Sequence, residues 1–171
     1  MPLPPAHLDT LDQHMRVHRQ RIAELRQLLE TLKREITLRE AGEGSDPNPK
    51  PEGIPGLVAE LELVEREIRR HEELLTLGQD ERLLNALGEL LDNPKLARAA
   101  SRDPRGYARE RGVELPLNMD VTLSLRDDQI EMLVAYYDEL APFLLTWNND
   151  GFSPPPGEQE PAPQPVGDVH S

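Results

Sequence analysis

The chain has 171 residues, no cysteine, 4% aromatic residues and a formal net charge of −13. The lack of cysteine excludes disulfides, thiolate metal sites, iron–sulfur clusters and cysteine nucleophiles. An acidic chain without a basic stripe has no surface that would bind a phosphate backbone, so nucleic-acid binding is not expected.

The first residues do not have the form of a targeting signal. They read Met-Pro-Leu-Pro-Pro-Ala-His, without the basic segment and the apolar segment of a secretory peptide. No apolar run reaches the roughly 18 residues that cross a bilayer. We therefore expect a cytoplasmic protein that does not enter a membrane.

A long first helix is predicted after a proline-rich lead-in at residues 1–5, because proline lacks the N–H donor that a helix interior needs. From Ala6 to about Glu40, apolar residues recur at alternating gaps of three and four. This heptad spacing is typical of a helix whose narrow apolar seam packs against another helix. The seam residues are Leu8, Leu11, Met15, His18, Ile22, Leu25, Leu29, Leu32 and Ile36.

A second helix of the same kind is predicted from Leu57 to Leu77, with Gly78 as the residue that ends it. Residues 41–56 are rich in proline and glycine and form the linker between the two helices. The helices are therefore expected to fold back as an antiparallel, coiled-coil-like hairpin over residues 6–77. Its second seam consists of Leu57, Leu61, Val64, Ile68, His71 and Leu75.

A hairpin of only two helices leaves apolar residues beside its seams uncovered. We expect partial exposure of four such residues, Leu28, Leu38, Leu63 and Leu74. This surface favours a homo-oligomer or contact with a helix of a partner protein. The candidate interface residues on the hairpin are Leu8, Leu11, Met15, Ile22, Leu25, Leu29, Leu32, Ile36, Leu61, Val64, Ile68 and Leu75.

Residues 80–152 follow a different pattern and predict a small α+β domain. Leucines at helical spacing indicate a helix over residues 83–91, and two short helices follow it, the second opened by Asp103-Pro104. Residues 121–125 alternate between apolar and polar side chains, as in a strand. The segment from Ile130 to Tyr137 fits a helix face and a strand face equally well. Residues 153–171 are proline-rich with little apolar mass, and we expect them to be disordered.

One segment of this domain resembles a known family. Asp103-Pro104, Gly112-Val113-Glu114-Leu115-Pro116 and Val121-Thr122-Leu123 follow one another over residues 93–125. This order resembles the leader-domain family named after nitrile hydratase, which has a short helix, a helix opened by Asp-Pro, a Gly-Val-Glu-Leu-Pro turn and a strand. The resemblance implies a small docking fold, which in the family is recognised by enzymes that modify ribosomally made peptides. Hydratase chemistry is not expected, because that family's cysteine-rich metal motif has no counterpart here.

Two histidines of the first helix are weak candidates for metal ligation. His14 and His18 are four residues apart, a spacing that places two ligands on one helix face, and His71 or a glutamate would complete the set. The alternative is that His18 and His71 are polar seam residues that fix the register of the helices. If the ends of the hairpin align, His18 lies opposite Gly78 rather than opposite His71. We favour the seam and expect no bound metal or cofactor.

The remaining polar clusters do not predict an active site. A cluster of glutamates at residues 65–73 is explained by a solvated helix face. Asp127 and Asp128 lie in a segment, residues 126–129, that is either a turn or the start of a helix that they would cap. The chain contains no Gly-x-Ser-x-Gly, no phosphate-binding glycine loop and no His-Glu-x-x-His. We therefore expect that the protein is not an enzyme.

The aromatic residues gather in the small domain. Tyr107, Tyr136 and Phe143 are expected in its core, and Tyr137 and Trp147 either join that core or are exposed as anchors of an interface. We expect a non-enzymatic adaptor in which the hairpin assembles with itself or a partner, while the small domain docks a second protein. The alternative is a leader-bearing precursor of a post-translationally modified peptide.

Overall fold

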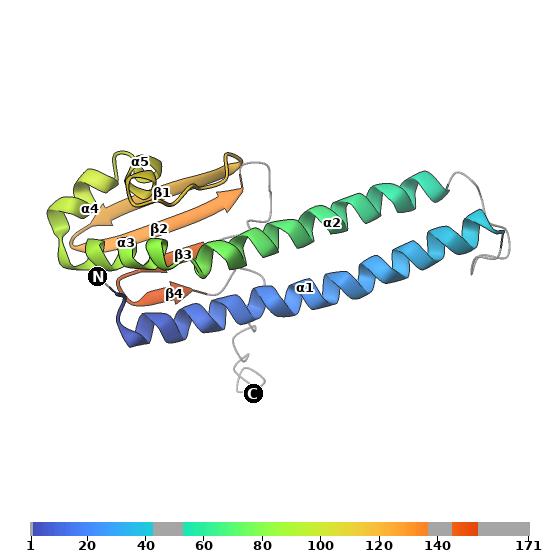
Figure 1. Ribbon diagram of the computed structural model, residues 1–171, viewed down its shortest axis with the longest axis horizontal. Helices are drawn as coiled ribbons and strands as arrows, with labels where there is room; N and C mark the ends of the chain where they lie inside the picture. Colours follow the sequence, from blue (N-terminus) through green and yellow to red (C-terminus); the bar gives the residue numbers. More distant parts are fainter. Residues whose placement is uncertain (1, 43–52, 137–144, 154–171) are drawn as a thin grey trace, which may run out of the picture. The chain divides into compact units, whose positions relative to one another are not determined.

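The computed structural model describes residues 2–42, 53–136 and 145–153 (Figure 1). These residues form five helices and a sheet of four strands, which confirms a mainly α chain with a helical hairpin and a small α+β part. The chain divides into two compact units. We call His18–Asp80 the hairpin unit, and Met1–Val17 with Glu81–Ser171 the sheet unit. Tyr137, Phe143 and the predicted disorder of residues 154–171 lie outside the described residues.

The hairpin unit consists of α1 (Pro5–Glu40) from His18 onward and α2 (Gly53–Gly78). The two predicted seams meet as expected. Its buried core is Ile22, Leu25, Leu32, Val64 and Ile68, with Leu29, Leu57, Leu61 and Leu75 packed against it. Two pairs of residues establish the antiparallel register, since Arg21 Nη2 is 3.6 Å from Glu67 Oε1 and the Arg39 guanidinium borders Gly53.

The second helix begins four residues earlier than predicted. Residues 53–56 of the predicted linker are the first turn of α2 rather than loop. Pro55 is compatible with this position, because the first N–H groups of a helix have no partner within the helix. None of the helices in residues 2–42 and 53–136 has the length and apolar composition needed to cross a membrane.

The sheet unit contains an antiparallel sheet in the order β1–β2–β3–β4: β1 (Met119–Arg126), β2 (Gln129–Tyr136), β3 (Leu145–Asn148) and β4 (Gly151–Ser153). One row of apolar side chains crosses all four strands, because Leu123 pairs with Met132, Met132 with Trp147, and Trp147 with Phe152. All four side chains are buried.

The segment that sequence left open between helix and strand is a strand. Ile130, Met132, Val134 and Tyr136 point to one face of β2 and are buried, which is the period of two that an antiparallel sheet needs. If this segment were a helix, it could not pair with β1 and β3 as it does. Pairing with the neighbouring strands therefore determines the secondary structure of a segment whose sequence pattern fits a helix and a strand equally well.

Three helices precede the sheet: α3 (Glu81–Asp92), α4 (Pro94–Ala100) and α5 (Pro104–Glu110). The second short helix begins at Asp103-Pro104 as predicted, and the first begins in the same way, with Asn93 as a cap followed by proline. Asn93 Oδ1 accepts the Leu96 N–H at 3.1 Å, and Asp103 Oδ1 accepts the Gly106 N–H at 3.0 Å. Gly112 has a φ of 82°, the left-handed conformation that ends such a segment.

Polar side chains join these helices to the start of the sheet. The Tyr107 hydroxyl donates to the Ala86 carbonyl at 2.7 Å, and the Arg111 guanidinium stacks 3.7 Å from the Tyr107 ring centroid. Burial raises the pKa of Tyr107 to about 12; Arg111 lowers it and Glu89 raises it. Arg105 donates to the carbonyls of Leu115, Pro116 and Met119 and so holds the extended connection to β1.

Candidate functional site

The first turns of α1 belong to the sheet unit and bind its outer strand. Thr10 Oγ1 accepts the N–H of Phe152 at 2.8 Å, and His7 Nε2 donates to the Asn149 carbonyl at 2.9 Å. His14 Nδ1 donates to the Ser153 carbonyl. His7, Thr10 and His14 are spaced by three and four residues and share a helix face. This face covers the edge of the sheet, whose backbone groups would otherwise remain unpaired.

This contact changes the interpretation of the first heptads. The sequence assigned Leu8, Leu11 and Met15 to a seam with the second helix, but these residues lie in the sheet unit. Leu11 and Met15 are buried there, while Leu8 is 43% exposed. The hairpin therefore begins at His18 rather than at Ala6. The physical reason is that an a/d stripe marks one buried helix face, and a sheet edge can bury it as well as a helix.

Trp147, a candidate interface anchor, is fully buried. Its side chain is 0% exposed and donates its Nε1–H to His7 Nδ1 at 3.0 Å. His7 therefore carries its proton on Nε2, where it donates to the Asn149 carbonyl. The interpretation of Trp147 as an exposed anchor is wrong, because this hydrogen bond satisfies its one polar group inside the sheet unit.

A pair of buried histidines lies in the hairpin. The Nδ1 atoms of His18 and His71 are 2.7 Å apart, and their ring centroids are 4.9 Å apart. The expectation that His18 lies opposite Gly78 is wrong. The earlier start of α2 moves the partner of His18 by one turn toward the N-terminus of α2, and the observed register moves it by about one turn more, to His71. One Nδ1 carries a proton and the other accepts it, so the pair favours a state in which at least one ring is neutral.

Burial, together with the smaller effect of the Arg21 charge, lowers the pKa of His71 from 6.5 to about 4. A cationic His71 would be poorly solvated in this core. In the ranges 2–42, 53–136 and 145–153, no three His, Asp or Glu side chains are grouped closely enough to hold a metal ion. The contact between the two rings supports the interpretation of His18 and His71 as polar seam residues. His14 makes a different contact, because its Nδ1 donates to the Ser153 carbonyl.

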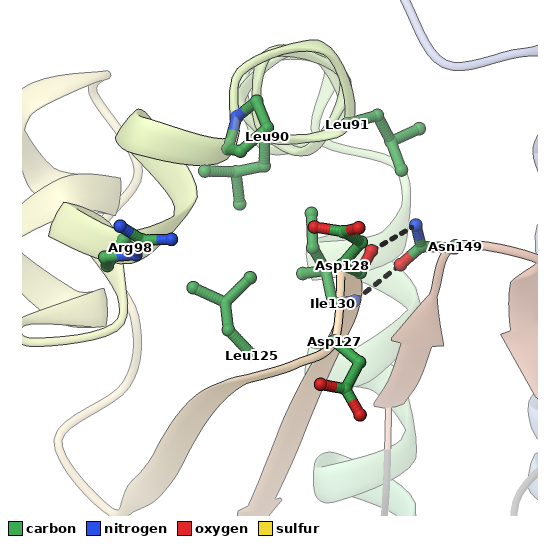
Figure 2. Close-up of a pocket in the computed structure, with 9 residues that line it drawn as sticks. Leu90, Leu91, Arg98, Leu125, Asp127, Asp128, Ile130 and Asn149 are labelled. Carbon is green, nitrogen blue, oxygen red and sulfur yellow. Dashed lines mark hydrogen bonds between the residues drawn. The ribbon is translucent and has the colours of Figure 1, made fainter.

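A hollow of about 480 Å³ opens in the sheet unit beside the β1–β2 turn (Figure 2). Leu90 and Leu91 of α3 and Leu125 and Ile130 of the strands supply its apolar lining, and Arg98 reaches it from α4. Its further lining residues are Pro94, Asp127, Asp128 and Asn149. The hollow therefore combines an apolar surface with both signs of charge.

The turn at this hollow is a two-residue hairpin loop in the left-handed conformation. Asp127 and Asp128 have φ angles of 49° and 68°, and Arg126 pairs with Gln129. Asn149 holds the turn from β3, because its Oδ1 accepts the Ile130 N–H at 2.5 Å and its Nδ2 donates to the Asp128 carbonyl at 3.2 Å. Asp127 and Asp128 thus form a β-turn, which is one of the two interpretations that the sequence left open, and they do not cap a helix.

We expect Asp128→Gly to raise the free energy of unfolding by about 0.5 to 1 kcal/mol, because glycine occupies the left-handed region without the Cβ clash. Urea unfolding followed by circular dichroism measures this change. The matched control is Asp120→Gly, at an exposed position of β1 with extended backbone, where glycine should destabilise by a similar amount. A loss of stability in Asp128→Gly would contradict a strained turn.

The hairpin also carries an uncovered apolar flank. Leu28 is 40% exposed and Leu63 is 60% exposed, as the sequence predicted, whereas Leu74 is fully buried. The other hairpin candidates Ile22, Leu25, Leu32, Val64 and Ile68 are buried within the hairpin, and Leu29, Ile36, Leu61 and Leu75 are partly buried. Within the hairpin unit, the exposed leucines among the described residues are therefore Leu28 and Leu63, which lie beside the seams.

Comparison with known protein families, curated proteins and solved structures gave no match to this chain. The resemblance of residues 93–125 to the nitrile hydratase leader family stays a prediction.

Proposed function

We propose that the protein is a non-enzymatic assembly adaptor whose hairpin unit associates with a second copy of itself. The observation that carries the proposal is the exposure of Leu28 on α1 and Leu63 on α2. Exposed leucines scattered singly need no explanation, but two leucines on one flank place apolar surface on the same side of the hairpin.

The two leucines lie on the same flank of the hairpin. Leu28 follows Arg21 by seven residues and Leu63 precedes Glu67 by four, so each shares a helix face with one member of the Arg21–Glu67 ion pair. In the antiparallel register of His18 with His71, the level of residue 28 on α1 corresponds to about residue 61 to 63 on α2. Leu28 and Leu63 are therefore neighbours across the two helices.

Charge supports a second copy as the partner. From His18 to Glu40, α1 has six Lys and Arg and four Glu, which gives +2, while α2 has three Arg and six Glu, which gives −3. In a pair whose two-fold axis runs along the helices, α1 of each copy faces α2 of the other, so opposite charges meet around the leucines. An acidic partner helix would match α1 alone, and a basic one would match α2 alone.

We expect sedimentation equilibrium of the full chain to give a monomer–dimer equilibrium, and Leu63→Glu to weaken it at least hundredfold. Two copies of Leu63 would be buried per dimer, and burial of each contributes about 1.5 to 3 kcal/mol. The matched control is Leu117→Glu, because Leu117 is an 89% exposed leucine of the sheet unit. A strictly monomeric parent chain, or equal dimerisation of parent and Leu63→Glu, would contradict the proposal.

The alternative function, a leader-bearing precursor, is supported by the order of elements that the resemblance requires. A capped helix α5, Gly112 and strand β1 follow one another at the matched residues. The tail that would be modified lies outside the described residues. Intact-mass measurement of the protein produced with its neighbouring genes separates the two functions, because an unchanged mass favours the adaptor.

A further inference from the structure

We propose that the hollow beside the β1–β2 turn binds a small aliphatic zwitterion, either a free aliphatic amino acid or a short peptide of such residues. In this arrangement the ligand's side chain packs on the leucines, its carboxylate pairs with Arg98 and its ammonium group pairs with Asp128. The site is separate from the Leu28–Leu63 flank, and the proposal does not depend on self-association.

The apolar part of the site is built from residues of different elements. Leu90 of α3 and Ile130 of β2 are buried behind it, and Leu91 and Leu125 are partly exposed at its surface. A volume of about 480 Å³ lies in the range of small-molecule sites, which have a mainly apolar lining and a few polar groups. Aliphatic lining without an aromatic ring favours an aliphatic ligand over a planar one.

The charged groups occupy opposite sides of this lining. Figure 2 shows Arg98 and Asp128 on either side of Leu125. Throughout the described part of the chain, no ion pair is formed by Arg98, Asp127 or Asp128. Charges beside an apolar surface are less screened than charges in open water, so they attract opposite charges of a ligand more strongly. One cation and opposing carboxylates match the two ends of a zwitterion.

The turn that carries Asp128 is held in place before any ligand binds. Asn149 bonds the Asp128 carbonyl and the Ile130 N–H, which fixes the backbone on both sides of this carboxylate. Asp128 is also in a left-handed conformation that restricts its backbone. A pre-organised charge loses less conformational entropy on binding, so the turn suits recognition.

The test is isothermal titration of the full chain with leucine, leucyl-leucine, N-acetyl-leucine, leucinamide and N-acetyl-leucinamide. We expect saturable binding of leucine or leucyl-leucine, and at least tenfold weaker binding when either charge of the ligand is blocked. Binding of leucine identifies a free amino acid as the ligand, and binding of the dipeptide alone identifies a peptide. Equal binding of N-acetyl-leucinamide, or no saturation by either zwitterion up to about 10 mM, would overturn the proposal.

Variants then assign the charges. Arg98→Gln and Asp128→Asn should each weaken binding at least tenfold, whereas Arg102→Gln, which changes an exposed arginine outside the hollow, should leave it unchanged. Asparagine tolerates the left-handed conformation, so Asp128→Asn keeps the turn. Undiminished binding in both Arg98→Gln and Asp128→Asn would overturn the assignment. Leu63→Glu should bind the zwitterion like the parent, which separates this test from that of dimerisation.

Discussion

Acidification from pH 7 to about 4.5 is expected to lower the free energy of unfolding by about 2 to 3 kcal/mol through His71 alone. His71 is buried against His18 in the hairpin, and its pKa is lowered from 6.5 to about 4, first by burial and then by the charge of Arg21. The pair cannot accept a proton on both Nδ1 atoms and keep the hydrogen bond between them.

The direction of this change in stability follows from how many protons the folded and the unfolded chain bind. Above about pH 6.5, His71 is neutral in both the folded and the unfolded chain, so its contribution does not change. Between pH 6.5 and about 4, the unfolded chain binds a proton that the folded chain does not bind, and the free energy of unfolding therefore decreases as the pH is lowered. Below about pH 4 the folded chain binds it too, and the loss from this group levels off.

The measurement is urea unfolding followed by far-ultraviolet circular dichroism at several pH values between 4.5 and 7.5. His71→Gln should be less stable than the parent at pH 7, and its stability should fall less steeply on acidification. All other ionisable groups are common to the two proteins, so the difference between the two slopes reports the loss of His71. Equal slopes in parent and His71→Gln would contradict a neutral buried His71.

The long helices were predictable because heptad spacing is a local property of the sequence. The cores of both seams, from Ile22 to Leu32 and from Val64 to Ile68, are buried as predicted. The partner of each seam residue was less predictable, because it depends on where the second helix begins. Gly53-Ile54-Pro55-Gly56 has loop composition but forms the first helical turn of α2, and this extra turn accounts for part of the displacement of the partner of His18 from Gly78 to His71.

The role of the first three turns of α1 was not predictable from periodicity. Leu11 and Met15 continue the heptads without interruption, yet they lie in the sheet unit. His7, Thr10 and His14 lie one position before Leu8, Leu11 and Met15, so they place polar groups beside the apolar stripe, where both a coiled coil and a sheet edge accommodate them. The sequence pattern therefore did not separate these two arrangements.

The hollow was not predictable, because its lining comes from segments that are distant in sequence. Asp127-Asp128 between two alternating segments favours a hairpin turn, and this was the one local signal at the site. The contacts of that turn depend on Asn149 and on the position of Arg98, which only the folded arrangement brings near it. Within the described residues, Arg98 and Asp128 lie beside leucines without an ion-pair partner, and this property of the folded arrangement leaves no pattern along the sequence.

Trp147→Ala is expected to cost about 3 to 5 kcal/mol of unfolding free energy, the effect of removing a fully buried aromatic side chain from a packed core. Trp147 is in the apolar row that crosses all four strands, between Met132 and Phe152. Its loss also leaves His7 Nδ1 without the Nε1–H donor. Urea unfolding followed by circular dichroism at pH 7 measures the cost.

Two further variants separate the hydrogen bond from the packing. His7→Ala should cost about 1 to 3 kcal/mol, because the buried Nε1–H of Trp147 then has no acceptor, while His7→Gln should cost less, since a glutamine oxygen can accept it. Trp147→Phe removes the donor and keeps most of the buried ring. In the double variant Trp147→Phe/His7→Ala the two costs should not add, because each change removes the same bond. Simple additivity, or a small effect of Trp147→Ala, would mean that α1 is not held to the sheet by this contact and that Thr10 and His14 alone attach it to β4.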